Sequence, residues 1–206
     1  MDFPVNVAIV YYSATGHVAQ IAQEMAEAAA KAGARVRLRK VAELAPKAAV
    51  DSNPTWAAHA AATADIPLAT TDDLIWADAV LMGSPTRFGN IASQLKQFLD
   101  TLGGVWQQGL LADKVYSGFT STGTLHGGHE STLLALTNTF HHFGGIVIAP
   151  GYTHADKFAD GNPYGTSHHD AGGTVPVDDV TRAAARVQAE RVVKFARALA
   201  VAPVAA

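Results

Sequence analysis

Short apolar runs of strand length alternate with segments of helical periodicity along this chain of 206 residues. Alternation of this kind is typical of a parallel sheet covered by helices on both faces. The length suits one domain, and a hydrophobic share of 49% is enough to supply its core. We therefore predict a single α/β domain over residues 1–206, with five parallel strands at 7–12, 34–39, 79–83, 115–120 and 146–149.

The second strand predicts the order of the sheet. Residues 34–39 read Ala-Arg-Val-Arg-Leu-Arg, so apolar and basic side chains alternate. In a parallel sheet buried on both faces, only a partly solvated edge strand tolerates this pattern. The order 2-1-3-4-5 places the second strand at an edge, so we predict a flavodoxin-like winding.

Helical patterns follow the strands, and one of them is expected to end at a glycine pair. After residues 79–83, the side chains Ile91, Leu95, Phe98 and Leu102 recur at helical spacing. The next two residues, 103–104, are both glycine, which is typical of a helix C-terminus. We therefore expect this helix to end there.

Two long segments do not fit simple connections between strands and helices. Residues 46–71 are rich in Ala, Pro and Thr and show no clear period, and residues 151–176 are rich in Gly, His and Asp. Connections of this length are usually functional. We expect two insertions that cover a site or contact a partner subunit.

The loop after the first strand is suited to a phosphate. Residues 11–18 read Tyr-Tyr-Ser-Ala-Thr-Gly-His-Val and lead directly into a helix, whose N-terminus attracts anions. The loop lacks the lysine of nucleoside triphosphate loops and the three glycines of dinucleotide loops. A phosphate held by hydroxyls and amides alone favours flavin mononucleotide (FMN), and an ordinary strand–turn–helix corner is the alternative. The candidate ligands are Ser13, Ala14, Thr15, Gly16, His17 and Val18.

Two more loops are expected at the same edge of the sheet. Residues 84–90 carry an aromatic ring, a cation and a glycine, and residues 121–128 are rich in Gly, Ser and Thr. In open parallel sheets, ligands bind at the carboxyl ends of the strands, where the winding reverses. Three such loops at one edge predict a site for a phosphorylated planar cofactor.

Composition excludes several other classes of protein. The chain has no cysteine, so any redox chemistry requires a bound cofactor. A net charge of −3 without a basic run argues against nucleic acid or an anionic membrane as a partner. No apolar stretch approaches the roughly 20 residues that span a bilayer. The segment 1–6 has no secretion signal, so we expect a cytoplasmic protein. The nine histidines are scattered over loops, and we expect no metal site.

Four motifs in order along the chain resemble one family. They are Tyr-Tyr-Ser-x-x-Gly-His at 11–17, Pro-Thr-Arg-Phe-Gly-Asn at 85–90, Ser-Thr-Gly-Thr with a following Gly-Gly at 121–128, and Pro-Tyr-Gly at 163–165. In these motifs the chain resembles the WrbA family of flavodoxin-like NAD(P)H:quinone oxidoreductases. The second motif is specific to that family, whereas the first is shared with flavodoxins generally.

The resemblance implies a set of binding residues. FMN would be bound through its phosphate by residues 13–18, and Thr15 stands where the family often has a tyrosine associated with NAD(P)H. His141 matches a family histidine at the flavin and is the candidate catalytic residue, and Trp106 matches a tryptophan of the substrate pocket. The residues implied along the flavin ring and ribityl chain are Thr86, Arg87, Phe88, Ser121, Thr122, Gly123, Thr124, Leu125, His126 and Gly127.

The function expected from these motifs is the FMN-dependent, two-electron reduction of a quinone by NADH or NADPH. The nicotinamide nucleotide and the quinone would use one site over the flavin in turn, in a ping-pong scheme. The family also implies a homotetramer whose sites are completed by neighbouring subunits. One alternative is a flavodoxin that only carries electrons, although flavodoxins are usually shorter and more acidic. A signalling module of the same winding is less favoured, because Tyr12-Ser13 replaces the acidic residues it requires.

Overall fold

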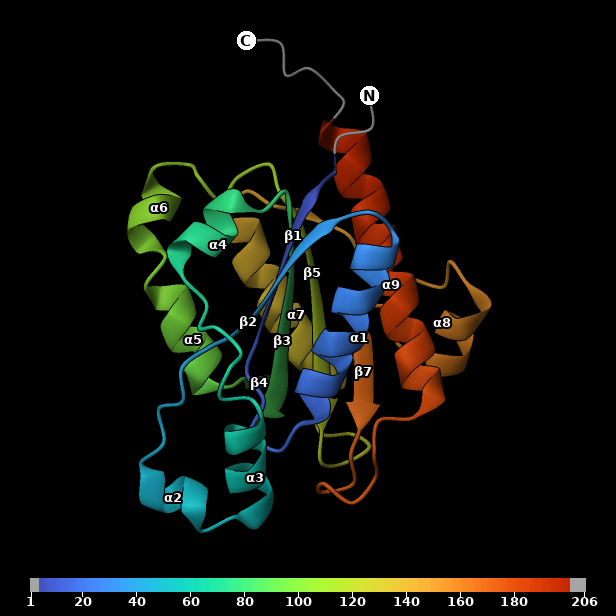
Figure 1. The fold of residues 1–206 in the computed structure, drawn as a ribbon. Helices are drawn as coiled ribbons and strands as arrows, with labels where there is room; N and C mark the ends of the chain where they lie inside the picture. Colours follow the sequence, from blue (N-terminus) through green and yellow to red (C-terminus); the bar gives the residue numbers. More distant parts are fainter. Residues whose placement is uncertain (1–3, 201–206) are drawn as a thin grey trace.

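The computed structural model describes residues 4–200, and its sheet has the strand order predicted from residues 34–39 (Figure 1). Residues 1–3, part of the segment searched for a secretion signal, lie outside this range. The main parallel strands run in the order β2-β1-β3-β5-β6, so the order 2-1-3-4-5 is confirmed. Their bounds are β1 (Asn6–Tyr11), β2 (Arg35–Lys40), β3 (Ala79–Arg87), β5 (Val115–Thr122) and β6 (Ile146–Val147).

Two further short strands complete the sheet. Strand β4 (Asn90–Ile91) turns back antiparallel against the end of β3. Strand β7 (Thr166–His169) lies beside the last four residues of β5, while β6 pairs with only the first two. The fifth position of the sheet is therefore shared by two segments far apart in sequence.

This sharing corrects the prediction of a fifth strand at 146–149 and of an irregular segment at 151–176. Pro150 follows Ala149 and has no N–H to donate to the ladder, so β6 ends early. The segment 151–176 contains the helix α8 (Ala155–Asp160) as well as β7. Strand β7 reads Thr-Ser-His-His, which carries no apolar alternation that could have predicted it.

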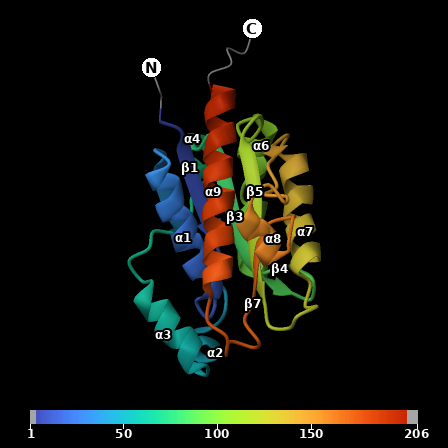
Figure 2. The ribbon, with the colours of Figure 1, turned by 90° about the vertical axis from the view of Figure 1, so that its right-hand side faces the viewer.

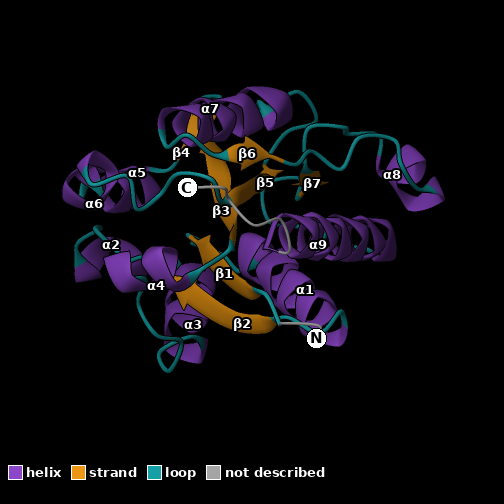
Figure 3. Ribbon diagram, turned by 90° about the horizontal axis from the view of Figure 1, so that it is seen from above, coloured by secondary structure: helices purple, strands orange, loops and turns teal. Residues whose placement is uncertain are grey.

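Helices cover both faces of the sheet, as predicted. Helices α1 (His17–Lys31) and α9 (Asp179–Ala200) lie side by side on one face (Figure 2). The other face is covered by α4 (Thr71–Trp76), α5 (Ser93–Asp100) and α7 (His129–His142) (Figure 3). Alternate residues of β1 face the two layers: Ile9 belongs to the core with α1 and α9, and Val10 to the core with α5 and α7. The sheet therefore separates two buried apolar clusters.

The glycine pair after α5 begins a helix instead of ending one. Helix α5 stops at Asp100, and α6 (Gly103–Gln107) starts at the first of the two glycines. Neither glycine has a positive φ, which is the conformation that makes glycine a common helix stop. The prediction that the helix extends to these glycines is therefore wrong by two residues.

The segment 46–71 contains two short helices, α2 (Lys47–Asp51) and α3 (Pro54–Ala62). The side chain of Asn53 caps α3 by accepting hydrogen bonds from the N–H groups of Thr55 and Trp56, at 3.1 and 3.2 Å. No residue of α3 is fully buried, so the helix has no apolar face to read from the sequence. Residues 67–69 then hydrogen-bond to Lys40 and so cover the outer edge of β2 at its last residue. In the range 4–200, no helix combines the length and the apolarity needed to cross a bilayer.

Candidate functional site

A cavity of about 240 Å³ lies at the carboxyl ends of β1, β3 and β5, where the predicted loops meet. The structure brings residues of all three loops into its walls. The first loop contributes Ser13, Ala14, Thr15, His17 and Val18, the second contributes Pro85 and Arg87, and the third contributes Ser121 and Gly123.

The first loop is built to receive an anion. The Gly16 N–H donates to the Ser13 hydroxyl oxygen at 3.1 Å, and Gly16 has a φ of 103°, which a side chain would strain. Helix α1 begins at the next residue, so the N–H groups of its first turn have no partner within the helix. Residues 13–18 contain no Lys or Arg. Hydroxyls, amide N–H groups and a helix N-terminus together suit a phosphate.

The second and third loops are held together by Thr86. Its hydroxyl donates to the Gly127 carbonyl at 3.1 Å and accepts hydrogen bonds from the Gly89 N–H and the Thr132 hydroxyl, at 3.2 and 2.9 Å. Phe88 is fully exposed and has a φ of 53°, which is rare for a residue other than glycine. Within one chain, therefore, the Phe88 ring does not line the cavity.

The rest of the third loop divides between two places. The Thr122 hydroxyl is buried, donates to the Thr124 carbonyl and lies 2.8 Å from His129 Nε2. Burial lowers the pKa of His129, which favours its neutral form. Leu125 and His126 line a different cavity, of about 660 Å³, between the start of α7 and β7.

A fourth wall of the first cavity was missed by sequence reasoning. Asp170, Gly172 and Gly173, just after β7, also line the cavity. Asp170 Oδ2 lies 3.8 Å from His17 Nδ1, and the His17 ring stacks on His168 at a centroid distance of 5.6 Å. The glycine pair was the available signal, but its place at the sheet edge depends on β7, which was not predicted.

Trp106 and His141 do not reach this cavity within one chain. Trp106 lies on α6 and donates its indole N–H to the His142 carbonyl at 2.6 Å, and His141 lies in the last turn of α7. Helix α7 starts at the carboxyl end of β5 and ends next to the start of β6, so both residues are at the opposite edge of the sheet. In Figure 1, α6 lies at the top of the molecule, whereas α3, whose His59 stands over Gly16 of the first loop, lies at the bottom. The expectation that both lie at the cofactor is not met within a single chain.

The described residues contain no group of three or more His, Asp or Glu side chains arranged to hold a metal ion. Among the described residues that line the first cavity, His17 is the one imidazole and Asp170 the one carboxylate, and hydroxyls, backbone amides and the Arg87 guanidinium supply its other polar groups.

Comparison with known proteins finds a matching family and relatives that cover nearly the whole chain. Residues 6–160 match the family described as "NADPH-dependent FMN reductase". A protein of Deinococcus radiodurans named "NAD(P)H dehydrogenase (quinone)" is 46% identical over 196 residues, covering 95% of this chain and 97% of its own length. A protein of the same name from Azorhizobium caulinodans is 40% identical over 200 residues, covering 94% and 98%.

Solved structures share the fold. The flavodoxin, WrbA-like protein from Agrobacterium tumefaciens superposes with a TM-score of 0.65 at 26% identity, covering 94% of this chain and 98% of the other. A flavodoxin from the domain Archaea superposes with a TM-score of 0.62 at 13% identity, covering 93% and 98%. The second similarity shows the flavodoxin-like fold alone, and the first agrees with the resemblance drawn from the four motifs.

Proposed function

Because the chain belongs to the NADPH-dependent FMN reductase family, we propose that it is an FMN-dependent oxidoreductase that reduces quinones with NADH or NADPH. The observation that carries this proposal is the convergence of three predicted loops on one cavity at the carboxyl edge of the sheet. The relatives named NAD(P)H dehydrogenase (quinone) match nearly the whole chain, which supports an enzyme over a flavodoxin that only carries electrons.

The residues around the cavity fit FMN. Residues 13–18 supply hydroxyls, amide N–H groups and a helix N-terminus for the phosphate, and no cation is needed there. Arg87 lines the cavity from the second loop, where the planar ring would lie, Ser121 and Gly123 line it from the third loop, and Thr86 joins these two loops. When bound, FMN would supply the redox chemistry that a chain without cysteine lacks, and the net reaction would transfer a hydride from NAD(P)H and a proton from solvent to the quinone, which becomes a hydroquinone. The protein itself would bind and orient FMN and its two substrates and shield them from water.

The first test of the function is steady-state kinetics. Under nitrogen, we expect the purified, FMN-loaded protein to oxidise NADH or NADPH over many turnovers only when benzoquinone is present as acceptor. Both substrates are flat and would use one site in turn, so double-reciprocal plots at several quinone concentrations should be parallel. Intersecting lines would show a ternary complex and contradict the shared site, and the absence of quinone-driven turnover would contradict the function itself.

The phosphate assignment predicts a measurable loss of affinity. Replacing Ser13 and Thr15 together with alanine should weaken FMN binding by about 1–3 kcal/mol, on the order of ten- to a hundredfold, because hydrogen bonds to a charged acceptor are lost. Flavin fluorescence during titration of FMN-free protein measures this. Ser93→Ala, which removes an exposed hydroxyl on α5, is the control and should leave the affinity unchanged. An unchanged affinity for FMN in the double variant would contradict the assignment of residues 13–18 to the phosphate.

We further propose that the protein is a cytoplasmic homotetramer and that Trp106 and His141 act in a neighbour's site. Both lie at the amino edge of the sheet, so only a second copy can bring them to the first cavity. There, Trp106 would add a flat apolar wall for the substrate. His141 would lie at the flavin, where an imidazole can hydrogen-bond or deliver a proton.

This arrangement predicts complementation between two inactive variants. Light scattering should give a tetramer, and Trp106→Ala alone should impair quinone reduction while FMN content stays nearly unchanged. A mixed tetramer made by co-producing Trp106→Ala with the Ser13→Ala/Thr15→Ala variant should be more active than either parent. In it, an intact loop of one subunit meets an intact tryptophan of the next. A monomer at micromolar concentration, or no gain in activity in the mixed tetramer, would refute a site built from two subunits.

A further inference from the structure

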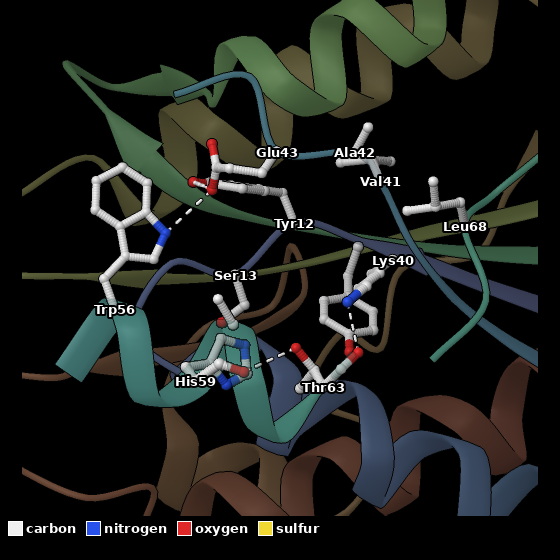
Figure 4. A pocket seen from close by; sticks show the side chains of 12 residues that line it. Tyr12, Ser13, Lys40, Val41, Ala42, Glu43, Trp56, His59, Thr63 and Leu68 are labelled. Carbon is white, nitrogen blue, oxygen red and sulfur yellow. Dashed lines mark hydrogen bonds between the residues drawn. The ribbon is translucent and has the colours of Figure 1, made fainter. Parts of the chain in front are cut away.

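A second cavity, of about 350 Å³, adjoins the first and is not used by the proposed FMN site. The two cavities share Ser13 in their walls. The second is enclosed by the end of β1, the chain after β2 and helix α3 (Figure 4). Tyr12, Trp56 and His59 bring three flat rings to it. A cavity with aromatic walls beside a redox site is suited to a planar group.

The acidic group in this cavity is already hydrogen-bonded to other groups of the protein. The Glu43 carboxylate accepts hydrogen bonds from the Tyr12 hydroxyl, Trp56 Nε1 and Gln94 Nε2, at 2.8, 3.0 and 2.8 Å. Its own loop adds two backbone N–H donors. Burial opposes ionisation, but these hydrogen bonds outweigh it and lower the pKa of Glu43. Glu43 is therefore ionised at neutral pH with its oxygens engaged, and it fixes the position of the indole.

The cation of the cavity is also engaged, because Lys40 Nζ donates to the Thr63 carbonyl. The Lys40 ammonium keeps its charge, because a carbonyl does not neutralise it, and this charge offsets that of the Glu43 carboxylate in the same cavity. Its walls therefore favour an uncharged ring over a phosphate or a carboxylate.

His59 supplies the polar edge that an uncharged heterocycle requires. Its ring stands over Gly16, with Nδ1 3.4 Å from the position that a Cβ on Gly16 would occupy. Burial lowers the pKa of His59, and the nearby positive charge of Lys40 lowers it further. The imidazole is thus neutral near pH 7 and offers one hydrogen-bond donor and one acceptor. Adenine presents an amino donor and ring-nitrogen acceptors at its edge, so either imidazole nitrogen can form one hydrogen bond with it.

Arg87 connects the two cavities electrostatically. It lines the first cavity, and its charge also acts on the Tyr12 hydroxyl of the second, where it opposes the rise in pKa that burial and Glu43 cause. A cation at this boundary is well placed for a pyrophosphate that runs from one cavity to the other.

We infer that the second cavity binds the adenosine half of the nicotinamide nucleotide, with adenine against Trp56 and His59 and the pyrophosphate beside Arg87. The inference rests on the proposed function, since it places the nicotinamide end at the first cavity.

The test compares two hydride donors, NADH and reduced nicotinamide mononucleotide, which lacks adenosine. Base–aromatic stacking predicts that Trp56→Ala raises the KM for NADH about tenfold and leaves the kcat/KM of the shorter donor unchanged. Trp56→Phe keeps a stacking ring but loses the hydrogen bond to Glu43, so it should retain most of the NADH affinity. Phe158→Ala, which removes an exposed aromatic ring on α8, is the matched control and should change neither donor.

Calorimetric titration with adenosine 5′-monophosphate gives a second readout that needs no turnover. Binding to the FMN-loaded protein, whose phosphate loop is filled, should be lost in Trp56→Ala and kept in Trp56→Phe. Equal losses with both donors would show that Trp56 only supports the fold, and no loss with either would show that adenosine binds elsewhere; both results overturn the inference. If the unmodified protein turns over neither donor, the proposed function fails instead.

Discussion

Replacing Lys157 with methionine should destabilise the folded protein by about 3–5 kcal/mol, the usual cost of breaking a buried ion pair. Lys157 and Asp160 form an ion pair on α8, and their side chains are 0% and 2% exposed. Lys157 Nζ also donates to the Gly165 carbonyl at 3.3 Å, which ties α8 to the start of β7. Methionine fills the space but leaves the Asp160 carboxylate buried without its partner. Urea unfolding followed by circular dichroism measures the loss.

The chain offers a matched control for this variant. Lys47 and Asp51 form the same kind of pair on α2, 2.6 Å apart, but their side chains are 85% and 52% exposed. Lys47→Met should therefore change the stability by only about 0–1 kcal/mol. Replacing Lys157 and Asp160 together with methionine and leucine should recover part of the loss, because no buried charge is left unpaired. If Lys157→Met costs no more than Lys47→Met, the buried pair does not stabilise the fold.

Replacing Gly128 with alanine should reduce the affinity for FMN by about a hundredfold. Gly128 has a φ of 100°, and a Cβ there would lie 2.7 Å from the Gly89 Cα and 2.8 Å from the Ser131 hydroxyl. The first contact is with backbone, so it is relieved only when the second and third loops move apart. A strained backbone and an overpacked contact each cost about 1–3 kcal/mol. The lost spacing would fall where we propose that the planar ring of FMN binds.

Flavin fluorescence titration of the FMN-free variant gives this affinity, and urea unfolding of the same sample separates it from a general loss of stability. Gly104→Ala is the matched control, since Gly104 has no positive φ and a Cβ there would have no neighbour within 4 Å among the described residues. An FMN affinity equal to that of the control would mean that the contact between Gly89 and Gly128 does not shape the site.

Parts of the site were predictable because they depend on residues that are adjacent in the sequence. The hydroxyls and glycine of residues 13–18 stand directly between a strand and a helix, so their place at the sheet edge follows from the βα unit itself. The positions of Trp106 and His141 were also implicit in chain order. A residue at the end of a helix that follows a parallel strand lies at the amino edge of the sheet, away from the βα loops.

The sequence by itself determined the alternation of strands and helices, the edge position of β2 and the three loops around the first cavity, because each follows from a pattern of residues close in sequence. Only the tertiary structure decided which distant segments pack against these elements and loops. The pairing of β7 with β5, the position of α3 over Gly16 and the bonds of Glu43 link segments far apart in the chain. Such contacts form because one segment buries or hydrogen-bonds better than its competitors at a given place, and no local pattern records that competition.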